Sequence, residues 1–117
     1  VYKRQQLNVR EGKQFLEPFT SMNPFHCVPF LELDDGTVIS ESISICRYLE
    51  EIYPNPALFG TTAETRAIID MWLRRFELDG FLPMLHAVRN HLENFKGRVI
   101  PGTRTDLPQV PEMVTRG

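Results

Sequence analysis

The stretch from Val28 to Tyr53 constrains the fold of this 117-residue chain more than any other, because it carries two structural signals in succession. Its first part, Phe30–Ile39, predicts a β-hairpin, since two β-prone runs flank Asp35-Gly36, a pair that supplies the positive φ values of a tight turn. Its second part predicts an amphipathic helix that starts near Ser42, because apolar residues recur there at spacings of three and four.

The junction between hairpin and helix, Ser40-Glu41-Ser42, is the best functional candidate in the sequence. Backbone N–H groups at a helix start have no partner within the helix, and together with the helix dipole they attract an anion. The alternative is structural: Ser40 or Ser42 caps the helix by accepting a hydrogen bond from a backbone N–H.

Val28-Pro29, at the head of the hairpin, favours the ligand interpretation. A cis bond there would turn the backbone of Val28 outward, where an extended peptide could pair with it as an added strand. A backbone-pairing residue beside an anion-binding helix start suits a small peptide that carries a carboxylate. Asn23-Pro24, a few residues earlier, is interpreted only as punctuation of the approach to the hairpin.

Three motifs follow one another along this part of the chain: Asn23-Pro24-x-x-x-Val28-Pro29, Leu33-Asp34-Asp35-Gly36 and Glu41-Ser42-x-x-Ile45-x-x-Tyr48-Leu49. In this order they resemble the glutathione-binding half of a cytosolic glutathione S-transferase. The flanking segments are similar as well. Asn8–Gly12 resembles the segment after that family's second strand, and Met71–Glu77 resembles the first long helix of its helical domain, most closely in bacterial members.

The resemblance implies an α/β fold: an incomplete thioredoxin-like domain, which is N-terminal in glutathione S-transferases, followed by the start of an all-α C-terminal domain. We expect the thioredoxin-like domain at residues 1–54, a linker at 55–61 and the helical domain at 62–117. Prolines and a glycine around the expected linker are typical of a domain boundary. Val1–Asn8 aligns with the family's second strand, so we expect a chain truncated at both ends, without the first strand and helix.

Local patterns predict the remaining elements. Residues 11–22 predict a loop with a short helix, because Pro18 interrupts the helical spacing. Thr61-x-x-Glu64 predicts a capping box, and a long helix with a bend near Gly80 and Pro83 is expected after it. Residues 101–117 predict a loop.

The resemblance also implies a function: the glutathione thiolate attacks a small hydrophobic electrophile in a cytoplasmic homodimer that uses no metal. Val28 would pair with the peptide backbone of glutathione, and Pro29 would hold the bend. At the γ-glutamyl end, Glu41 would meet the ammonium, and the N–H and hydroxyl of Ser42 would bind the carboxylate. No catalytic residue is assigned, because the thiol-activating residue of the family belongs to the segment expected to be missing.

Four further residues are candidates. The family often has lysine or glutamine at the position of Cys27, where it reaches the glycyl end of glutathione, and glycine at that of His26; His26 could substitute as the carboxylate partner. A neighbouring Cys and His also raise the question of a nucleophile or metal ligand, but a catalytic thiol requires a lowered pKa. Arg74 and Arg75 belong either to a solvated face or to a cleft between domains or a dimer partner.

Composition excludes several classes of function. A net charge of −2 offers no bulk electrostatic reason to bind nucleic acid or an anionic membrane. No apolar run approaches the roughly 20 residues that span a bilayer. Two cysteines without metal-like spacing indicate reduced thiols in a cytosolic protein.

Two rival interpretations stay open: a non-catalytic binding or scaffold module with the same fold, and a glutathione-dependent reductase or isomerase. The residue at the thiol-activating position of the family would separate them. Cysteine favours redox chemistry, serine or tyrosine favours conjugation, and neither favours a scaffold.

Overall fold

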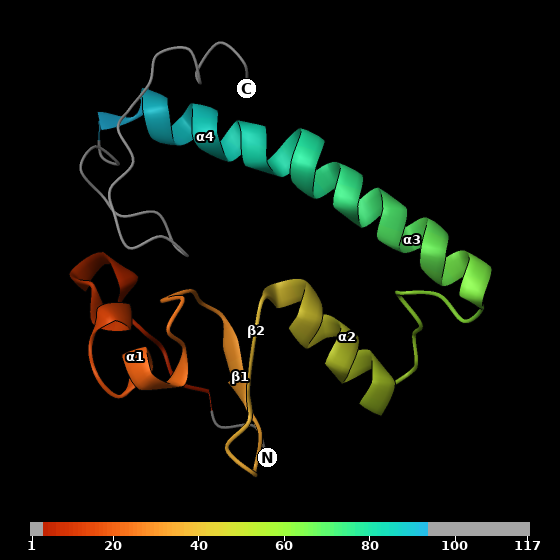
Figure 1. Ribbon diagram of the computed structural model, residues 1–117, viewed down its shortest axis with the longest axis horizontal. Helices are drawn as coiled ribbons and strands as arrows, with labels where there is room; N and C mark the ends of the chain where they lie inside the picture. Colours follow the sequence, from red (N-terminus) through yellow and green to blue (C-terminus); the bar gives the residue numbers. More distant parts are fainter. Residues whose placement is uncertain (1–3, 94–117) are drawn as a thin grey trace. The chain divides into compact units, whose positions relative to one another are not determined.

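The computed structural model describes residues 4–93, which divide into two compact units at the step from Ile52 to Tyr53. Unit 1 contains the 3-10 helices η1 (Val9–Glu11) and η2 (Lys13–Phe15), helix α1 (Phe19–Met22), strands β1 (Phe30–Glu32) and β2 (Val38–Ser40), and helix α2 (Ser42–Ile52) (Figure 1). Unit 2 contains helix α3 (Ala63–Arg75), the π-helix η3 (Phe76–Phe81) and helix α4 (Leu82–His91).

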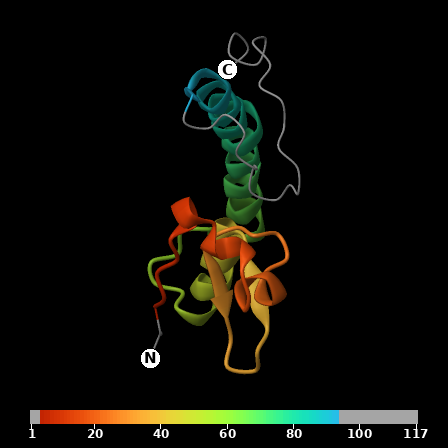
Figure 2. The same ribbon diagram turned by 90° about the vertical axis from the view of Figure 1, so that its left-hand side faces the viewer.

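Strands β1 and β2 form the predicted antiparallel hairpin (Figure 2). In this hairpin Phe30 lies opposite Ser40. The turn differs from the prediction, because Gly36 has a positive φ, 84°, and Asp35 does not. The loop therefore has three residues and ends in a left-handed glycine, which is a common hairpin connection. In this loop the Asp35 carboxylate accepts a hydrogen bond from the Thr37 N–H at 2.9 Å.

Helix α2 follows β2 directly and contacts both strands. Its apolar face is formed by Ile45, Tyr48 and Leu49, which are partly buried, whereas Ser44 and Glu51 are exposed. The prediction of an amphipathic helix here is confirmed, and it ends one residue before Tyr53. This helix positions the Glu41-Ser42 junction at the end of β2.

The N-terminal segment corrects one prediction. Residues 4–8 are irregular rather than a strand, and residues 1–3 lie outside the described part. A strand persists only where its backbone pairs with a neighbour, and β1 and β2 pair only with each other in the described sheet. The predicted short helix is confirmed as α1, which begins after Pro18.

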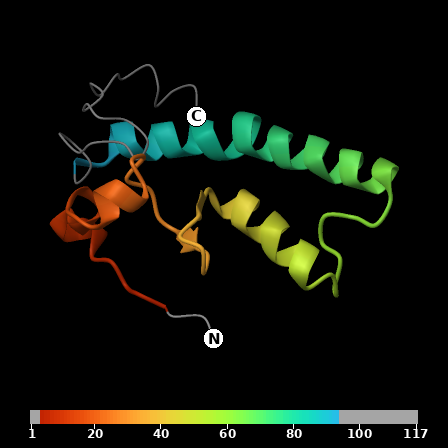
Figure 3. The same ribbon diagram turned by 60° about the horizontal axis from the view of Figure 1, so that its bottom comes forward.

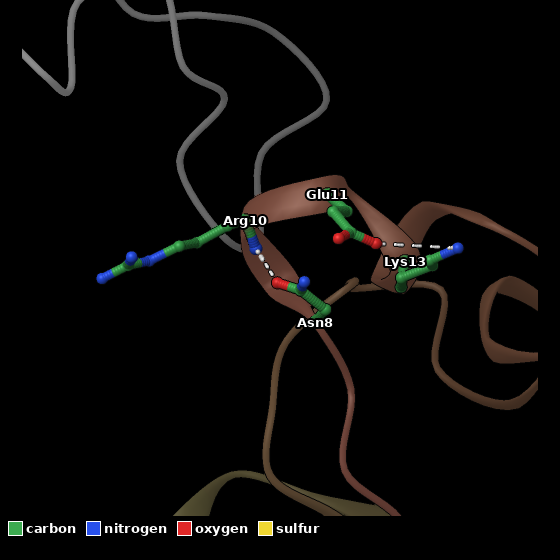
Figure 4. A network of polar contacts seen from close by, with 4 residues as sticks. All are labelled: Asn8, Arg10, Glu11 and Lys13. Atoms are coloured by element: carbon green, nitrogen blue, oxygen red, sulfur yellow. Dashed lines mark hydrogen bonds and ion pairs between the residues drawn. The ribbon is translucent and has the colours of Figure 1, made fainter.

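The first turn of unit 1 is held by local polar contacts (Figure 4). The Asn8 Oδ1 accepts a hydrogen bond from the Arg10 N–H at 3.2 Å and so caps η1. The Lys13 Nζ lies 3.8 Å from the Glu11 Oε2, and both side chains are well exposed. An exposed ion pair of this kind contributes at most about 1 kcal/mol.

The start of α3 corrects the predicted capping box by one residue. Thr62, not Thr61, is the N-cap: its Oγ1 accepts a hydrogen bond from the Thr65 N–H at 3.2 Å, and the Thr65 Oγ1 accepts one from the Thr62 N–H at 3.0 Å. The threonine hydroxyl thus takes the role expected of the Glu64 carboxylate.

Where the sequence predicts a bend, near Gly80 and Pro83, the structure instead has η3, a π-helix that joins α3 to α4 in one continuous helix (Figure 3). Pro83 follows η3 directly inside this continuous helix, and because proline has no N–H, one backbone hydrogen bond of the helix is missing at this position. The loop predicted for residues 101–117 lies outside the described residues.

The described residues have no buried apolar core. Only Asn23 and Arg89 are buried in residues 4–93, at 3% and 7% exposure, while Phe76 and Leu58 are each 70% exposed. No helix in this part of the chain combines the length and the apolar content of a bilayer-spanning segment.

Candidate functional site

The open end of the hairpin brings the two halves of the predicted site together. Because Phe30 pairs with Ser40, the residues just before β1 and just after β2 leave the sheet at the same end. Val28 and Pro29 are therefore placed at the same end of unit 1 as the Glu41-Ser42 start of α2.

The Val28–Pro29 peptide bond is cis, as the sequence predicts. The Val28 side chain is 46% exposed. Neither the N–H nor the C=O of Val28 makes a hydrogen bond to any part of the chain that the structure describes. As far as residues 4–93 are concerned, both backbone groups of Val28 can thus pair with an incoming peptide.

Glu41 adopts an unusual backbone conformation between β2 and α2. Its φ is 71°, in the left-handed region that costs a non-glycine residue about 1 kcal/mol or more. Its C=O accepts the first hydrogen bond of α2, from the Ile45 N–H at 2.9 Å. The Glu41 carboxylate is exposed and forms no ion pair within the described residues. Backbone outliers of this kind cluster at ligand sites.

Ser42 is the first residue of α2, so its N–H lacks a helical partner. Glu41, not a serine, precedes the first helical residue. The hydroxyls of Ser40 and Ser42 make no hydrogen bond to residues 4–93, and the capping alternative therefore gains no support. A helix start whose serine hydroxyl bonds none of the described residues can accept an anionic group.

Cys27 is not an activated thiol. Burial raises the pKa of the Cys27 thiol above its ordinary value, and the nearby Glu41 carboxylate raises the pKa further. The thiol donates a weak hydrogen bond to the Phe25 C=O at 3.4 Å. Because the thiolate is the nucleophile, these surroundings disfavour catalysis by Cys27.

His26 is turned toward η2. Its φ is 57°, a conformation that glycine would adopt more readily. Its Nδ1 lies 3.2 Å from the Gln14 C=O, and its ring centroid lies 4.9 Å from that of Phe15. A carbonyl only accepts, so Nδ1 carries the proton, and in the neutral ring Nε2 has no proton to donate to a carboxylate. Carboxylate binding by His26 would need the doubly protonated ring.

Arg74 and Arg75 both form exposed ion pairs in unit 2. Arg74 pairs with Glu77 at 2.5 Å, and Arg75 pairs with Asp79 at 3.4 Å. Arg75 and Asp79 also border an open groove of about 530 Å³, whose other described lining residues are Met71, Trp72, Phe76 and Gly80. Within unit 2 both arginine side chains are thus exposed, and Arg75 also lies beside an apolar groove.

The sequence analysis missed Asn23, which is nearly inaccessible to solvent. Its Nδ2 donates to the Cys27 C=O at 2.8 Å, and its Oδ1 accepts from the Phe25 N–H at 3.2 Å. Asn23 therefore fixes the loop that leads to Val28. The sequence signals are an asparagine before a proline, which is common in ordinary turns, and its place in the Asn23-Pro24-x-x-x-Val28-Pro29 motif, and neither indicates a buried side chain.

Comparison with known proteins identifies the family. Residues 2–52, which include every residue of the hairpin-end site, match the family model for the N-terminal domain of glutathione S-transferase. Residues 2–52 belong to the glutathione S-transferase family. Unit 1 is accordingly the thioredoxin-like domain of a glutathione S-transferase, and the helices of unit 2 belong to the helical part that follows it.

Individual relatives agree with this membership. A class Gtt2 glutathione S-transferase of Vibrio parahaemolyticus is 46% identical, with a TM-score of 0.66, over 78% of this chain and 44% of that protein. Gtt2 from Saccharomyces cerevisiae is 29% identical, with a TM-score of 0.75, over 94% and 50%. Maleylacetoacetate isomerase of Rattus norvegicus is 43% identical over 60 residues, or 51% and 27%. The chain thus spans half or less of the length of each of these relatives.

Proposed function

We propose that the protein binds glutathione at the open end of the β1–β2 hairpin and conjugates its thiolate to small hydrophobic electrophiles. One observation carries the proposal: the hydrogen-bonding groups of Val28, the left-handed Glu41 and the Ser42 hydroxyl, which bonds no described residue, lie at the same end of unit 1. Together they offer a peptide-pairing edge, a carboxylate and an anion-binding helix start.

The chemistry of these groups matches that of glutathione. The γ-glutamyl end carries an ammonium and a carboxylate on the same carbon. Glu41 supplies a carboxylate for the ammonium, and the N–H and hydroxyl of Ser42 supply donors for the carboxylate. Val28 pairs with the peptide backbone next to this end, and Pro29 holds the bend that turns Val28 outward.

The reaction itself requires a glutathione thiolate, since the thiol is a poor nucleophile. Cys27 does not meet this need, because its own pKa is raised. No residue of the described part is assigned as the activator. We propose a cytoplasmic homodimer as the active form, with the exposed apolar side chains beside Trp72 and Phe76 as the surface that a second copy covers.

A glutathione-dependent isomerase is the second candidate, favoured by the similarity to rat maleylacetoacetate isomerase. Both activities use a bound glutathione, so both need the hairpin-end site. Conjugation of a generic electrophile, absent in a dedicated isomerase, separates them.

The test is glutathione binding by calorimetry, in the protein that carries this chain at the full length its gene encodes. We expect Ser42→Ala to lose about 1–3 kcal/mol of binding free energy, because the anion loses a hydroxyl donor. Glu41→Gln should weaken binding as well, because the ammonium loses its counter-charge. Ser44→Ala, in the same helical turn, is the matched control and should bind like the parent. If Ser42→Ala and Glu41→Gln both bind like the parent, these residues are only structural.

A further inference from the structure

We propose that Asn23 is the positioning residue of the peptide-pairing edge: its side-chain amide orients the Cys27–Val28 peptide group so that the Val28 N–H faces the bound peptide. The inference rests on the proposed function. It adds a residue that never touches the ligand and acts on it through the backbone.

Asn23 is the most buried side chain of residues 4–93, and all its polar groups are hydrogen-bonded. Its N–H donates to the Phe19 C=O at 2.8 Å, and its C=O accepts from the His26 N–H at 3.0 Å. Its side chain accepts from the Phe25 N–H and donates to the Cys27 C=O. A buried amide is costly unless it is bonded in this way, so these contacts define one conformation of the loop.

The contact to Cys27 determines where Val28 points. The Cys27 C=O and the Val28 N–H belong to the same peptide group, which is trans. In a planar trans peptide the C=O and the N–H point in opposite directions. With the Cys27 C=O held by the Asn23 Nδ2 at 2.8 Å, the Val28 N–H is turned away from Asn23.

The Val28 N–H can donate to a ligand, because it has no hydrogen-bond partner in the described part of the chain. No other donor in residues 4–93 bonds the Cys27 C=O, so Asn23 alone fixes this peptide plane there. A hydrogen bond to a peptide C=O also polarises the N–H of the same group and makes it a better donor. Asn23 therefore both orients the Val28 N–H and makes it a stronger hydrogen-bond donor.

The experiment compares Asn23→Ala and Asn23→Asp with the parent, at the full length that the gene encodes. Asn23→Asp keeps the shape and the acceptor for the Phe25 N–H but places an oxygen against the Cys27 C=O. Ser21→Ala is the matched control, since it removes an exposed hydrogen bond of α1, from the Ser21 Oγ to the Glu17 Oε2 at 2.6 Å, without touching the loop. Proteins labelled with ¹⁵N-valine and ¹⁵N-serine are titrated with glutathione and followed by NMR.

In the parent and in Ser21→Ala, we expect saturation with glutathione to shift the amide signals of both Val28 and Ser42. In the Asn23 variants the affinity should fall about three- to tenfold, the loss expected from one misdirected hydrogen bond. At saturation the Ser42 shift should persist while the Val28 shift is lost. A residue that only supports the fold would change both signals together.

The outcomes separate the two proposals. If the Asn23 variants bind like the parent with the Val28 shift intact, the positioning role is wrong and the glutathione site stands. If neither signal of the parent shifts, the proposed function fails, and this inference fails with it. If both variants fail to fold, the parent labelled with ¹⁵N-asparagine decides. Its Asn23 side-chain amide signal should move when Val28 binds the ligand, and an unmoved signal would overturn the proposal.

Discussion

The surroundings of Cys27 determine the reactivity of its thiol. Burial first, and the Glu41 carboxylate second, raise the pKa of its thiol, which favours the protonated thiol over the thiolate. Cys46, the other cysteine, is exposed on α2. We expect iodoacetamide at about pH 8 to modify Cys27 more slowly than Cys46, as measured by mass spectrometry of the peptides, because only the thiolate reacts.

The pH dependence of this reaction has a definite sign. The rate at Cys27 should rise as the pH increases toward its raised pKa, and Glu41→Gln should move that rise to lower pH, because it removes the charge that opposes the thiolate. Glu32→Gln, an exposed carboxylate on β1, is the control and should leave the rate profile unchanged. Modification of Cys27 ahead of Cys46 at neutral pH would restore the nucleophile interpretation.

Single residues of the site differ in how far the sequence predicts them. The cis bond before Pro29 was predictable, because only an X-Pro bond adopts cis at low cost. The left-handed conformation of Glu41 was not predictable, since glutamate has no preference for a positive φ. Glu41 adopts it because the chain turns there from β2 into α2. Asn23 was missed because burial is a property of the folded loop and leaves no pattern in the sequence.

The same distinction holds for the elements. The hairpin and α2 follow from local signals, namely a glycine turn and a helical period, and both are confirmed. The strand predicted before Val9 depends on a partner strand, so its residues alone could not establish it. The capping box is displaced because Thr61 and Thr62 are equally able to cap, and the position of the preceding turn decides between them.

Gly60 lies in the turn before Thr62, and a substitution there tests whether this turn determines where α3 starts. Its φ is 90°, and an added Cβ would lie 2.7 Å from the Thr65 Oγ1 and 2.9 Å from the Arg66 N. Gly60→Ala therefore combines left-handed strain with a collision against helix backbone. We expect it to lower the free energy of unfolding by more than about 2 kcal/mol in chemical denaturation.

Gly36→Ala is the matched control for Gly60→Ala. Gly36 also has a positive φ, 84°, but an added Cβ would meet nothing within 4 Å. Only the left-handed strain applies there, and we expect a loss of about 1 kcal/mol. Equal losses at the two glycines would mean that the turn at Gly60 does not lie against the start of α3.

The whole molecule presents an unusual amount of apolar surface in its described part. None of its apolar side chains between residues 4 and 93 is buried, and Trp72, Phe76 and Leu58 are 55%, 70% and 70% exposed. The described sheet has two strands, so each strand has one edge without a partner there. A two-stranded hairpin is marginally stable by itself, and open edges and apolar patches both promote association.

We therefore expect the 117-residue chain, expressed by itself, to aggregate or to remain partly unfolded. Light scattering after size-exclusion chromatography and thermal unfolding measure these properties directly.

We also expect no conjugation of glutathione to a generic electrophile above background, because a bound thiol whose pKa is not lowered stays unreactive near neutral pH. The control is the protein at the full length that its gene encodes, assayed at the same concentration. A monodisperse chain with a sharp unfolding transition and clear turnover would mean that residues 4–93 contain more of the stabilising and catalytic groups than their exposed side chains and raised Cys27 pKa indicate.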